Sequence, residues 1–516
     1  MEITLQYFTG CPNWSIAAER LATIASERPD ITVLHRLVDT FDDAHWRPHT
    51  RTTAHGDHRT ARSSRTVNAE YDLFVIGAGM AGITAANRCA SQGWKVGIVD
   101  TLPYGGTCAL RGCDPKKILR RGAEIIDDAR LMHGKGVNQN GLTLDWPALM
   151  RHKHGFTDDI PGAMESTLKR NGVSTFHGDA RFVSRHHVDI NGEQHSAARF
   201  LIATGARPRP LEFSGQELLV DSTEFLNLEA LPRRIVFVGG GFVSFELAHI
   251  AARAGVECVI IDHGTKPLRA FDPDLVDLLV RRSEQAGIRV HHSTSVSAVT
   301  HTSTGFHVAI ERDRATSNID ADLVVHGAGR VPNFDGLDLE AADIAHGPQG
   351  IDVFGHLQSR SNPYVYAAGD AAGTPGERLT PVAVFEGKVA ASNMLKGIET
   401  VPDYAGVPST VFTIPELNRV GMLEQEAARD GREISVRYHD TSGWYSNYRI
   451  GETTAATKVI VDPATDLILG AHLLGPGYSE VINTFGLAIK LGLTTRQLKS
   501  VTATYPSVGS DLGSMF

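Results

Sequence analysis

The 516-residue sequence has few cysteines and no long apolar run, and each shortage excludes a class of protein. Five cysteines in so long a chain cannot form the framework of a disulfide-stapled secreted domain. No stretch approaches the ~18–20 consecutive apolar residues of a membrane-spanning helix, so no membrane partner is expected. The first residues lack the basic and apolar regions of a secretory signal, and we therefore expect a cytoplasmic protein.

The chain also lacks an excess of positive charge. Its formal net charge is −9 at pH 7, whereas a protein that binds nucleic acid normally carries a basic footprint, so no nucleic-acid partner is expected. Apolar residues make up 42% and charged residues 21%, a balance typical of globular domains. At ~150 residues per domain, the length predicts three or four domains.

The most informative stretch runs from residue 105 to residue 117 and contains Cys108 and Cys113. In an unbroken α-helix a five-residue step separates Cα atoms by roughly 8–9 Å, whereas a disulfide needs about 4.4–6.8 Å. Either these thiols never pair or the backbone bends, and Gly112 is the residue that would permit a bend. The glycine turn before Cys108 predicts a helix start, where the dipole favours a thiolate, and two lysines follow. We interpret the stretch as a redox-active dithiol.

Two strand–glycine turn–helix–strand units, each closing on an acidic residue, predict two dinucleotide sites. The first unit comprises a strand over 71–76, the residues Gly77, Ala78, Gly79 and Gly82, and a strand over 95–99 that ends at Asp100. The second comprises a strand over 234–238, the residues Gly239 and Gly241, and a strand over 258–261 that ends at Asp262. The spacing from first glycine to acid is 23 residues in both units. Such glycines let the backbone approach a pyrophosphate at a helix N-terminus.

The dithiol stretch reads Gly-Gly-Thr-Cys, four residues, Cys, then Pro and Lys, and it resembles the class I pyridine nucleotide–disulfide oxidoreductases. That family includes glutathione reductases, dihydrolipoamide dehydrogenases and mercuric reductases. The resemblance covers about residues 69–516. It implies an α/β fold with two Rossmann-like dinucleotide-binding domains and a C-terminal α+β dimerisation domain. It also implies FAD at the first glycine unit, NAD(P)H at the second, and a homodimer.

The resemblance also implies domain boundaries. We expect an FAD-binding domain in two parts, residues 69–220 and 341–404. An NAD(P)-binding domain, residues 221–340, interrupts it, and a dimerisation domain occupies residues 405–516.

The segment before residue 69 falls outside this resemblance. Residues 1–41 have the strand–helix–strand pattern of a partial, short thioredoxin-like segment, with Cys11 at the position of that fold's first thiol and Trp14 in place of the second. We interpret this segment as a remnant or as a docking module for a protein partner, with a working thiol at Cys11 as the alternative. Residues 42–68 are rich in His, Arg and Thr and predict a flexible linker. Their histidines fit no metal-site spacing, so no metal is expected.

The resemblance assigns cofactor contacts to residues in each motif. The contacts expected for FAD, with Asp100 on a ribose hydroxyl and Asp370 on the ribityl chain, are Gly77, Ala78, Gly79, Gly82, Asp100, Gly106, Thr107, Lys117, Ala180, Thr204, Gly205, Gly369, Asp370, Thr380 and Ala383. The contacts expected in the nicotinamide domain and at its end are Gly239, Gly241, Phe242, Val243, Ser244, Asp262, His263, Gly329 and Arg330.

Family analogy also assigns catalytic roles. It implies that Cys113 faces the flavin as a charge-transfer thiolate and that Cys108 is the interchange thiol that attacks the acceptor. Lys116 and Glu246 match an ion pair beside the flavin, with Lys117 as the alternative lysine. On the pattern alone Glu246 could instead be an ordinary helix residue.

Two features bear on the nicotinamide dinucleotide. Phe242 matches an aromatic that shields the flavin until the nicotinamide enters, although the pattern alone would equally fit a core residue. An acid at Asp262 favours the free 2′-hydroxyl of NADH, whereas His263, Lys266 and Arg269 are cations that could hold the 2′-phosphate of NADPH. We expect NADH to be preferred.

The C-terminus departs from the disulfide reductases of this family, which carry a His-Pro pair whose His serves the interchange thiol as proton donor and acceptor. Here the pair is Tyr505-Pro506. A tyrosine of pKa ~10 is a poor base near neutrality but a workable donor. Mercuric reductases also have Tyr there, but they end in a vicinal Cys-Cys pair that this chain lacks.

The sequence therefore predicts an FAD-dependent NAD(P)H oxidoreductase that passes electrons through Cys108 and Cys113 to a disulfide or thiol-bound small-molecule acceptor. One alternative is a mercuric-ion reductase. Another is a flavoprotein redox sensor or docking partner that turns over no small substrate.

Overall fold

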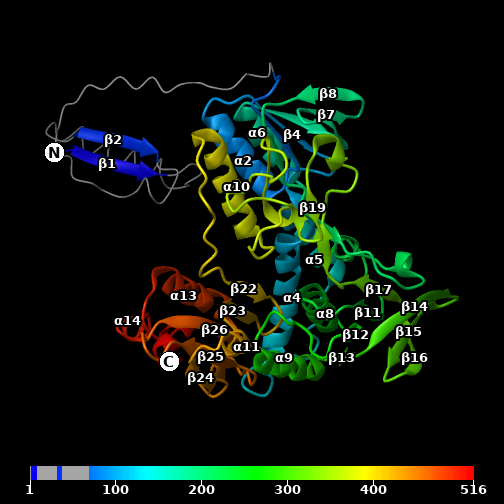
Figure 1. Ribbon diagram of the computed structural model, residues 1–516. Helices are drawn as coiled ribbons and strands as arrows, with labels where there is room; N and C mark the ends of the chain where they lie inside the picture. The colour runs from blue at the N-terminus through cyan, green and yellow to red at the C-terminus, as the bar shows by residue number, and fades with distance from the viewer. Residues whose placement is uncertain (1, 8–31, 38–68) are drawn as a thin grey trace. The chain divides into compact units, whose positions relative to one another are not determined.

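The computed structural model describes residues 2–7, 32–37 and 69–516 (Figure 1). The chain divides into two compact units, Met1–Arg65 and Thr66–Phe516. In the described residues of the second unit, no helix is both long and apolar enough to cross a membrane.

The first unit contains two of the predicted elements. Strands Glu2–Tyr7 (β1) and Thr32–Leu37 (β2) pair in parallel, as the strand–helix–strand pattern predicts. The helix expected between them, Cys11, Trp14 and the linker all lie outside the described residues.

The first sheet of the second unit is parallel and five-stranded, with the order β21-β9-β3-β4-β5. Its inner strands are short, fully buried apolar runs, as a parallel sheet covered on both faces requires. The strands are Leu73–Ile76 (β3), Val96–Asp100 (β4), Val173–His177 (β5), Phe200–Ile202 (β9) and Val365–Ala367 (β21). Strand β21 comes from a much later part of the chain, so two separate stretches build this sheet.

Alternate side chains of β3 point to opposite faces of the sheet, which produces two cores. Leu73 and Val75 pack against helices Met80–Ser91 (α2) and Thr380–Lys396 (α10), which lie side by side (Figure 1). Phe74 and Ile76 pack against an antiparallel sheet. The strands of that sheet are Ala180–Ser184 (β6), His187–Ile190 (β7) and Glu193–Ser196 (β8).

The second parallel sheet has four strands in the order β13-β12-β11-β17. Its strands are Arg234–Val238 (β11), Glu257–Ile261 (β12), Ile288–His291 (β13) and Leu323–His326 (β17). One face packs on helices Phe242–Arg253 (α8) and Pro273–Gln285 (α9). The other packs on an antiparallel sheet of Ser295–Thr302 (β14), Gly305–Arg312 (β15) and Ala315–Ala321 (β16).

The C-terminal sheet is antiparallel, with the order β22-β23-β26-β25-β24. Its strands are Ser409–Val411 (β22), Leu417–Gly421 (β23), Ser435–Asp440 (β24), Ala456–Val461 (β25) and Ile468–Leu474 (β26). Apolar residues of this sheet join the same core as α8 and α9. The helices of this part are Glu424–Arg429 (α11), Tyr445–Tyr448 (α12), Tyr478–Leu491 (α13), Thr495–Lys499 (α14) and the 3₁₀ helix Val508–Ser514 (η5).

Helices Gly106–Arg111 (α3) and Cys113–Leu131 (α4) follow β4, and α4 packs against α8. Figure 1 shows α4 running from the first sheet toward the C-terminal sheet. The other elements are Trp146–Thr157 (α5), Ile160–Arg170 (α6), Ala206–Pro208 (β10), Gln216–Leu218 (η2), Ser222–Phe225 (α7), Arg330–Pro332 (β18), Leu339–Ala342 (η3), His346–Gly347 (β19), Gly350–Ile351 (β20) and Gly369–Ala371 (η4). The predicted fold class, two Rossmann-like units followed by an α+β unit, is confirmed.

Candidate active site

The dithiol lies where two helices meet. Helix α3 ends at Arg111 and α4 begins at Cys113, so the backbone bends at Gly112 as the sequence predicts. A Cβ on Gly112 would lie 2.8 Å from the carbonyl oxygen of Thr107, so glycine is required here. Both thiols are free, and Cys108 donates a hydrogen bond to the sulfur of Cys113.

The glycine turn before α3 packs directly on the first dinucleotide motif. Gly105, whose φ is 126°, donates its N–H to the carbonyl oxygen of Ala78 at 3.0 Å. A Cβ on Gly106 would lie 2.7 Å from the Cα of Gly79. The two glycine motifs are therefore in backbone contact, which brings the dithiol to the predicted FAD cradle.

The two thiols have opposite pKa shifts. The hydrogen bond from Cys108 and the positive charges of Lys116 and Lys117 lower the pKa of Cys113 to about 6, against the effect of burial. The same hydrogen bond, together with burial, raises the pKa of Cys108. The hydroxyl of Thr380, the first residue of α10, lies 3.9 Å from the Cys113 sulfur. At neutral pH the pair therefore consists of a Cys113 thiolate and a Cys108 thiol.

This asymmetry predicts the pH dependence of alkylation. Because the pKa of Cys113 is lowered, its thiolate is present above pH ~6 and is lost as the pH falls through that value. In the reduced protein, iodoacetamide should label Cys113 with a midpoint near pH 6, against the pH ~8.5 of a free thiol. Peptide mass spectrometry measures the labelling. A Cys113 midpoint at pH 8 or above would contradict the assigned charges.

Two buried cysteines serve as internal controls for that experiment. Cys89 in α2 and Cys258 in β12 are fully buried, as the sequence predicts, and burial raises the pKa of each thiol. Neither should be labelled while the protein is folded.

Glu246 is the acceptor for both lysines. Lys116 Nζ lies 2.7 Å and Lys117 Nζ 3.3 Å from its Oε2, and the backbone N–H of Phe412 donates to its Oε1 at 3.1 Å. Glu246 is 2% exposed. Burial alone would raise its pKa, but the lysines and the Phe412 N–H outweigh burial and hold the pKa below its ordinary value. Lys116 and Lys117, the two alternative lysines of the sequence analysis, therefore both pair with the carboxylate of Glu246.

Phe242 is the first residue of α8, and its ring is 49% exposed, so it is not a core residue. The Nζ of Lys116 lies 5.4 Å from the ring centroid. The aromatic side chain therefore borders the dithiol site at an exposed position.

The first dinucleotide motif has the geometry of a phosphate cradle. Gly77 has a φ of 106°, and a Cβ there would lie 2.3 Å from the carbonyl oxygen of Ala203. The N–H of Ala78 donates to Asp100 at 2.7 Å. The hydroxyl of Thr204 is buried and has no hydrogen-bond partner within the described part of the chain. A helix N-terminus, a glycine turn and an unpartnered hydroxyl together fit a dinucleotide such as FAD.

The sequence analysis missed a residue that organises the second half of this site. Glu386, buried in α10, accepts hydrogen bonds from the Gly369 N–H at 2.6 Å, the Thr374 hydroxyl at 2.7 Å and the Tyr404 hydroxyl at 2.6 Å. It borders a cavity of about 380 Å³ that Asp370 also lines. A single acid in an otherwise apolar helical stretch was the available signal.

Replacing Glu386 tests this arrangement. Glu386→Gln should weaken FAD binding about tenfold, because an amide cannot accept from three donors as a carboxylate does. Release of fluorescent flavin from the purified protein measures the change. Glu399→Gln, an exposed residue in the loop after the same helix, is the matched control. Equal flavin release from the two variants would show that Glu386 does not shape the site.

Asp370 and Arg330 lie together in this region. Burial raises the pKa of Asp370, and the positive charges of Arg330 and Arg378 offset part of that effect. Arg330 in β18 donates to the carbonyl oxygen of Ala206. The remaining predicted contacts are found at helix starts, turns and strand ends, namely Gly82, Thr107, Ala180, Gly205, Gly329 and Ala383.

The second dinucleotide motif repeats the first. Gly239 also has a φ of 106°, and α8 begins directly after Gly241. Ser244 follows Phe242 and Val243 as the third residue of α8. Its hydroxyl is buried and has no hydrogen-bond partner among the described residues. The carboxylate of Asp262 packs beneath the loop, since a Cβ on Gly240 would lie 2.5 Å from its Cγ.

The cations that follow Asp262 are not free. Nη2 of Arg269 lies 3.1 Å from Nε2 of His263, and Nζ of Lys266 pairs with Asp277 at 2.6 Å. Asp262 itself is 4% exposed.

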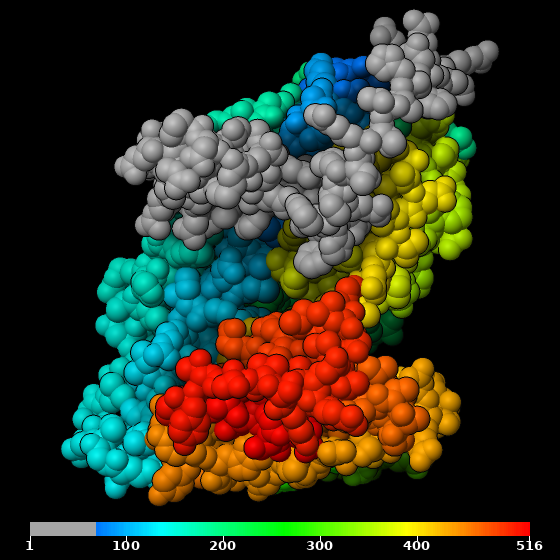
Figure 2. Space-filling model, turned by 90° about the vertical axis from the view of Figure 1, so that its left-hand side faces the viewer, coloured from blue at the N-terminus to red at the C-terminus, as the bar shows by residue number. Residues whose placement is uncertain are grey.

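Tyr505 stands apart from the dithiol within one chain. It is 77% exposed, and the C-terminal residues near it, red in Figure 2, lie at the surface. Within the described part of one chain, no hydrogen bond or ring contact joins it to Cys108 or Cys113. The role assigned to Tyr505 by family analogy therefore stays a prediction.

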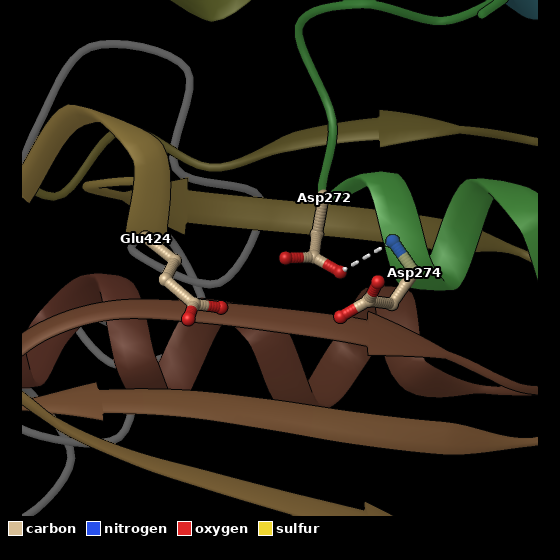
Figure 3. A group of neighbouring side chains, drawn as sticks. All are labelled: Asp272, Asp274 and Glu424. Carbon is tan, nitrogen blue, oxygen red and sulfur yellow. Dashed lines mark hydrogen bonds between the residues drawn. The ribbon is translucent and has the colours of Figure 1, made fainter. Parts of the chain in front are cut away.

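A cluster of three acids resembles a metal site but already holds a cation. Asp272 and Asp274 at the start of α9 face Glu424 of α11 (Figure 3). The Nζ of Lys458 lies 2.9, 2.5 and 3.2 Å from these three carboxylates. The chain's own ammonium group thus occupies the position that a metal ion would take.

A buried polar network joins α4 and α8 to the C-terminal sheet, and the sequence analysis missed it. Asp127 accepts from Arg253 at 2.9 Å and from Arg282 at 2.6 Å. Arg253 also donates to the carbonyl oxygen of Ile414, and the Ile414 N–H donates to Nδ1 of His249 at 3.0 Å. Polar residues recurring on one face of the apolar helix α8 were the available signal.

Comparison with known proteins agrees with this geometry. The family model described as pyridine nucleotide-disulphide oxidoreductase matches residues 71–387, and the model of that family's dimerisation domain matches residues 407–515.

The relatives of this chain differ in their named activities. The chain is 32% identical over 461 residues to a glutathione reductase of Schizosaccharomyces pombe, an alignment that covers 86% of this chain and 98% of the relative. It is 34% identical over 450 residues to a dihydrolipoyl dehydrogenase of Thermus scotoductus, covering 86% and 96%. It is 29% identical over 445 residues to a mercuric reductase of Lysinibacillus sphaericus, covering 86% and 81%. The chain therefore belongs to the pyridine nucleotide–disulphide oxidoreductase family, and its C-terminal sheet and helices form that family's dimerisation domain.

Proposed function

We propose that the protein is an NAD(P)H-dependent reductase that passes an electron pair through Cys108 and Cys113 to a disulfide or thiol-bound acceptor. The family binds FAD and uses NAD(P)H. The observation that carries the proposal is the polarised dithiol, a Cys113 thiolate beside two lysines and a Cys108 thiol, packed on the first dinucleotide cradle.

FAD, when bound, supplies the two-electron chemistry that links a reduced nicotinamide to a disulfide. The chain's residues handle the sulfur chemistry. Cys108 gives up its proton and attacks, as a thiolate, one sulfur of an acceptor disulfide. A mixed disulfide forms, and the displaced sulfur leaves as a thiolate that takes up the proton. The Cys113 thiolate then attacks the Cys108 sulfur, which closes the Cys108–Cys113 disulfide and releases the second sulfur as a thiolate. The acceptor gains two electrons, which the dithiol loses.

Neighbouring groups support these steps. Lys116 and Lys117 stabilise the thiolate of Cys113, and Glu246 pairs with both lysines and holds them in place. Tyr505 of a second subunit acts as the proton donor to the second leaving thiolate, in the homodimer that the dimerisation domain supports.

We further propose that NADH is the preferred donor. The supporting observations are the carboxylate of Asp262 beneath the second glycine turn and the engagement of Lys266 with Asp277. Asp262→Ala should lower kcat/KM for NADH about tenfold relative to NADPH, the equivalent of one charge-assisted hydrogen bond. Steady-state rates with both nucleotides measure this ratio. A wild-type preference for NADPH would overturn the assignment.

An acceptor panel tests the reaction itself. Oxidised glutathione, lipoamide, mycothiol disulfide and Hg(II) are each offered with NADH and with NADPH under anaerobic conditions. We expect one sulfur acceptor to be reduced much faster than the others. Equal, slow rates on all four would contradict the proposal and favour a redox sensor.

Mercuric-ion reduction is the second candidate. The observation that favours it is tyrosine at 505, because a metal ion held by two thiolates needs no base at that position. A mercuric reductase is also among the relatives of this chain. Fast turnover with Hg(II) alone in the panel would establish it.

A further inference from the structure

We propose that Arg419, in β23 of the dimerisation domain, is a positioning residue for the nicotinamide dinucleotide. It anchors the loop of residues 263–271, which follows Asp262 and carries His263, Lys266 and Arg269. The inference rests on the proposed function, because the dinucleotide site belongs to it.

The loop has a conformation that needs support. Leu268 has a φ of 48°, a left-handed value that is unfavourable for a branched side chain. Its N–H donates to the carbonyl oxygen of Gly240, the middle glycine of the second motif, at 2.9 Å. Leu268 and Phe271 are both buried. The shape of the loop is thus tied directly to the glycine turn on which the dinucleotide would lie.

Arg419 fixes the far end of this loop. Its side chain is 16% exposed, and its Nη1 donates to the carbonyl oxygen of Ala270. Its Nη2 lies 3.6 Å from Oε1 of Glu377, in the segment between Asp370 and α10. One guanidinium therefore joins the dimerisation domain to a loop of each dinucleotide-binding unit.

A second contact holds the next element in the same place. Lys458 of β25 pairs with Asp272, the N-cap of α9, at 2.9 Å, and both side chains are buried. Helix α9 lies against the dimerisation sheet, as Figure 1 shows. With α9 fixed by Lys458, Arg419 restrains the end of the loop at the carbonyl of Ala270.

A strained backbone persists only where its surroundings enforce it. Without Arg419 the loop can relax from the left-handed turn at Leu268, which displaces Arg269, His263 and the Gly240 carbonyl together. That change weakens binding of the dinucleotide. We expect the dithiol to be unchanged, because the groups that Arg419 contacts in the described part of the chain are the Ala270 carbonyl and Glu377 rather than either cysteine.

The test compares Arg419→Met with Arg419→Lys in the full-length holoprotein. Arg432→Met, at an exposed position in the same domain, is the matched control. Arg419→Met should raise KM and the dissociation constant for NADH about tenfold and leave kcat within about a factor of two, the pattern of lost uniform binding. Lysine at 419 should restore part of the affinity, because it can still donate to the Ala270 carbonyl.

Amide hydrogen exchange provides a readout that does not depend on turnover. Peptides covering residues 263–272 should exchange about tenfold faster in Arg419→Met than in wild type or in Arg432→Met. Wild-type exchange in a folded Arg419→Met protein would overturn the inference, as would a fall in kcat at unchanged KM. If Arg419→Met does not fold, Arg419→Lys against wild type decides by the same two measurements.

The two proposals fail in different ways. If the wild-type protein oxidises neither NADH nor NADPH, the proposed function is wrong, and the exchange rate of the loop still decides whether Arg419 restrains it. If the wild-type protein turns over, and Arg419→Met has the wild-type exchange rate in the loop and the wild-type affinity for NADH, the proposed function stands and the role of Arg419 is refuted.

Discussion

Cys108→Ser and Cys113→Ser should each lower acceptor reduction by NADH about 10³-fold or more. A serine hydroxyl cannot form the disulfide that stores the electron pair between the two half-reactions. Reduction of the bound flavin by NADH should remain in both variants, because that step precedes the dithiol. Stopped-flow absorbance measures reduction of the flavin, and a steady-state assay measures reduction of the acceptor, so the two half-reactions can be followed separately.

A third variant tests the hydrogen bond between the two thiols. Cys108→Ala retains Cys113 and its lysines but has no donor at 108, and the hydrogen bond from Cys108 is the largest cause of the lowered pKa of Cys113. The pH midpoint for alkylation of Cys113 should therefore rise in that variant. Cys89→Ala, at a buried cysteine away from the dithiol, should keep turnover within about a factor of two. A serine variant with wild-type turnover would refute the relay.

Asp127→Asn should lower the free energy of unfolding by about 3 kcal/mol, the low end of the range for breaking a buried ion pair. Asp127 compensates two buried guanidinium groups, those of Arg253 and Arg282, and the amide leaves both charges poorly paired. Denaturant unfolding monitored by tryptophan fluorescence measures the loss. Arg282 keeps a second carboxylate, Glu452, at 3.5 Å, which limits the effect.

The neighbouring residue provides the control. Asp128 lies next to Asp127 on α4 but is exposed, so Asp128→Asn should change the free energy of unfolding by no more than about 0.5 kcal/mol. Equal stability of the two variants would mean that the network does not hold α4 and α8 to the dimerisation domain.

Local features of this fold were predictable from the sequence because each has a local physical cause. Gly77 and Gly239 are glycines because the backbone there has a positive φ and touches the backbone that directly follows a neighbouring strand. The bend at Gly112 follows from the distance that two cysteines five residues apart would otherwise span. Buried strands such as β11 appear as short apolar runs between turn residues.

Other features could not be read from the sequence, because their partners are far apart along the chain. Asp127 and Arg253 are 126 positions apart, and Arg419 and Ala270 are 149 apart. No periodicity or motif links such pairs before the domains pack. The sequence pattern could not decide whether Lys116 or Lys117 pairs with Glu246. The packing of the helices shows that both lysines do.

The most direct test of the central claim is an anaerobic titration with NADH followed by alkylation and peptide mass spectrometry. The account predicts that Cys108 and Cys113 are disulfide-linked before NADH is added and that both accept label once each subunit has received two electrons beyond those needed by the flavin. A fully reduced flavin with the two peptides still joined by a disulfide would contradict it.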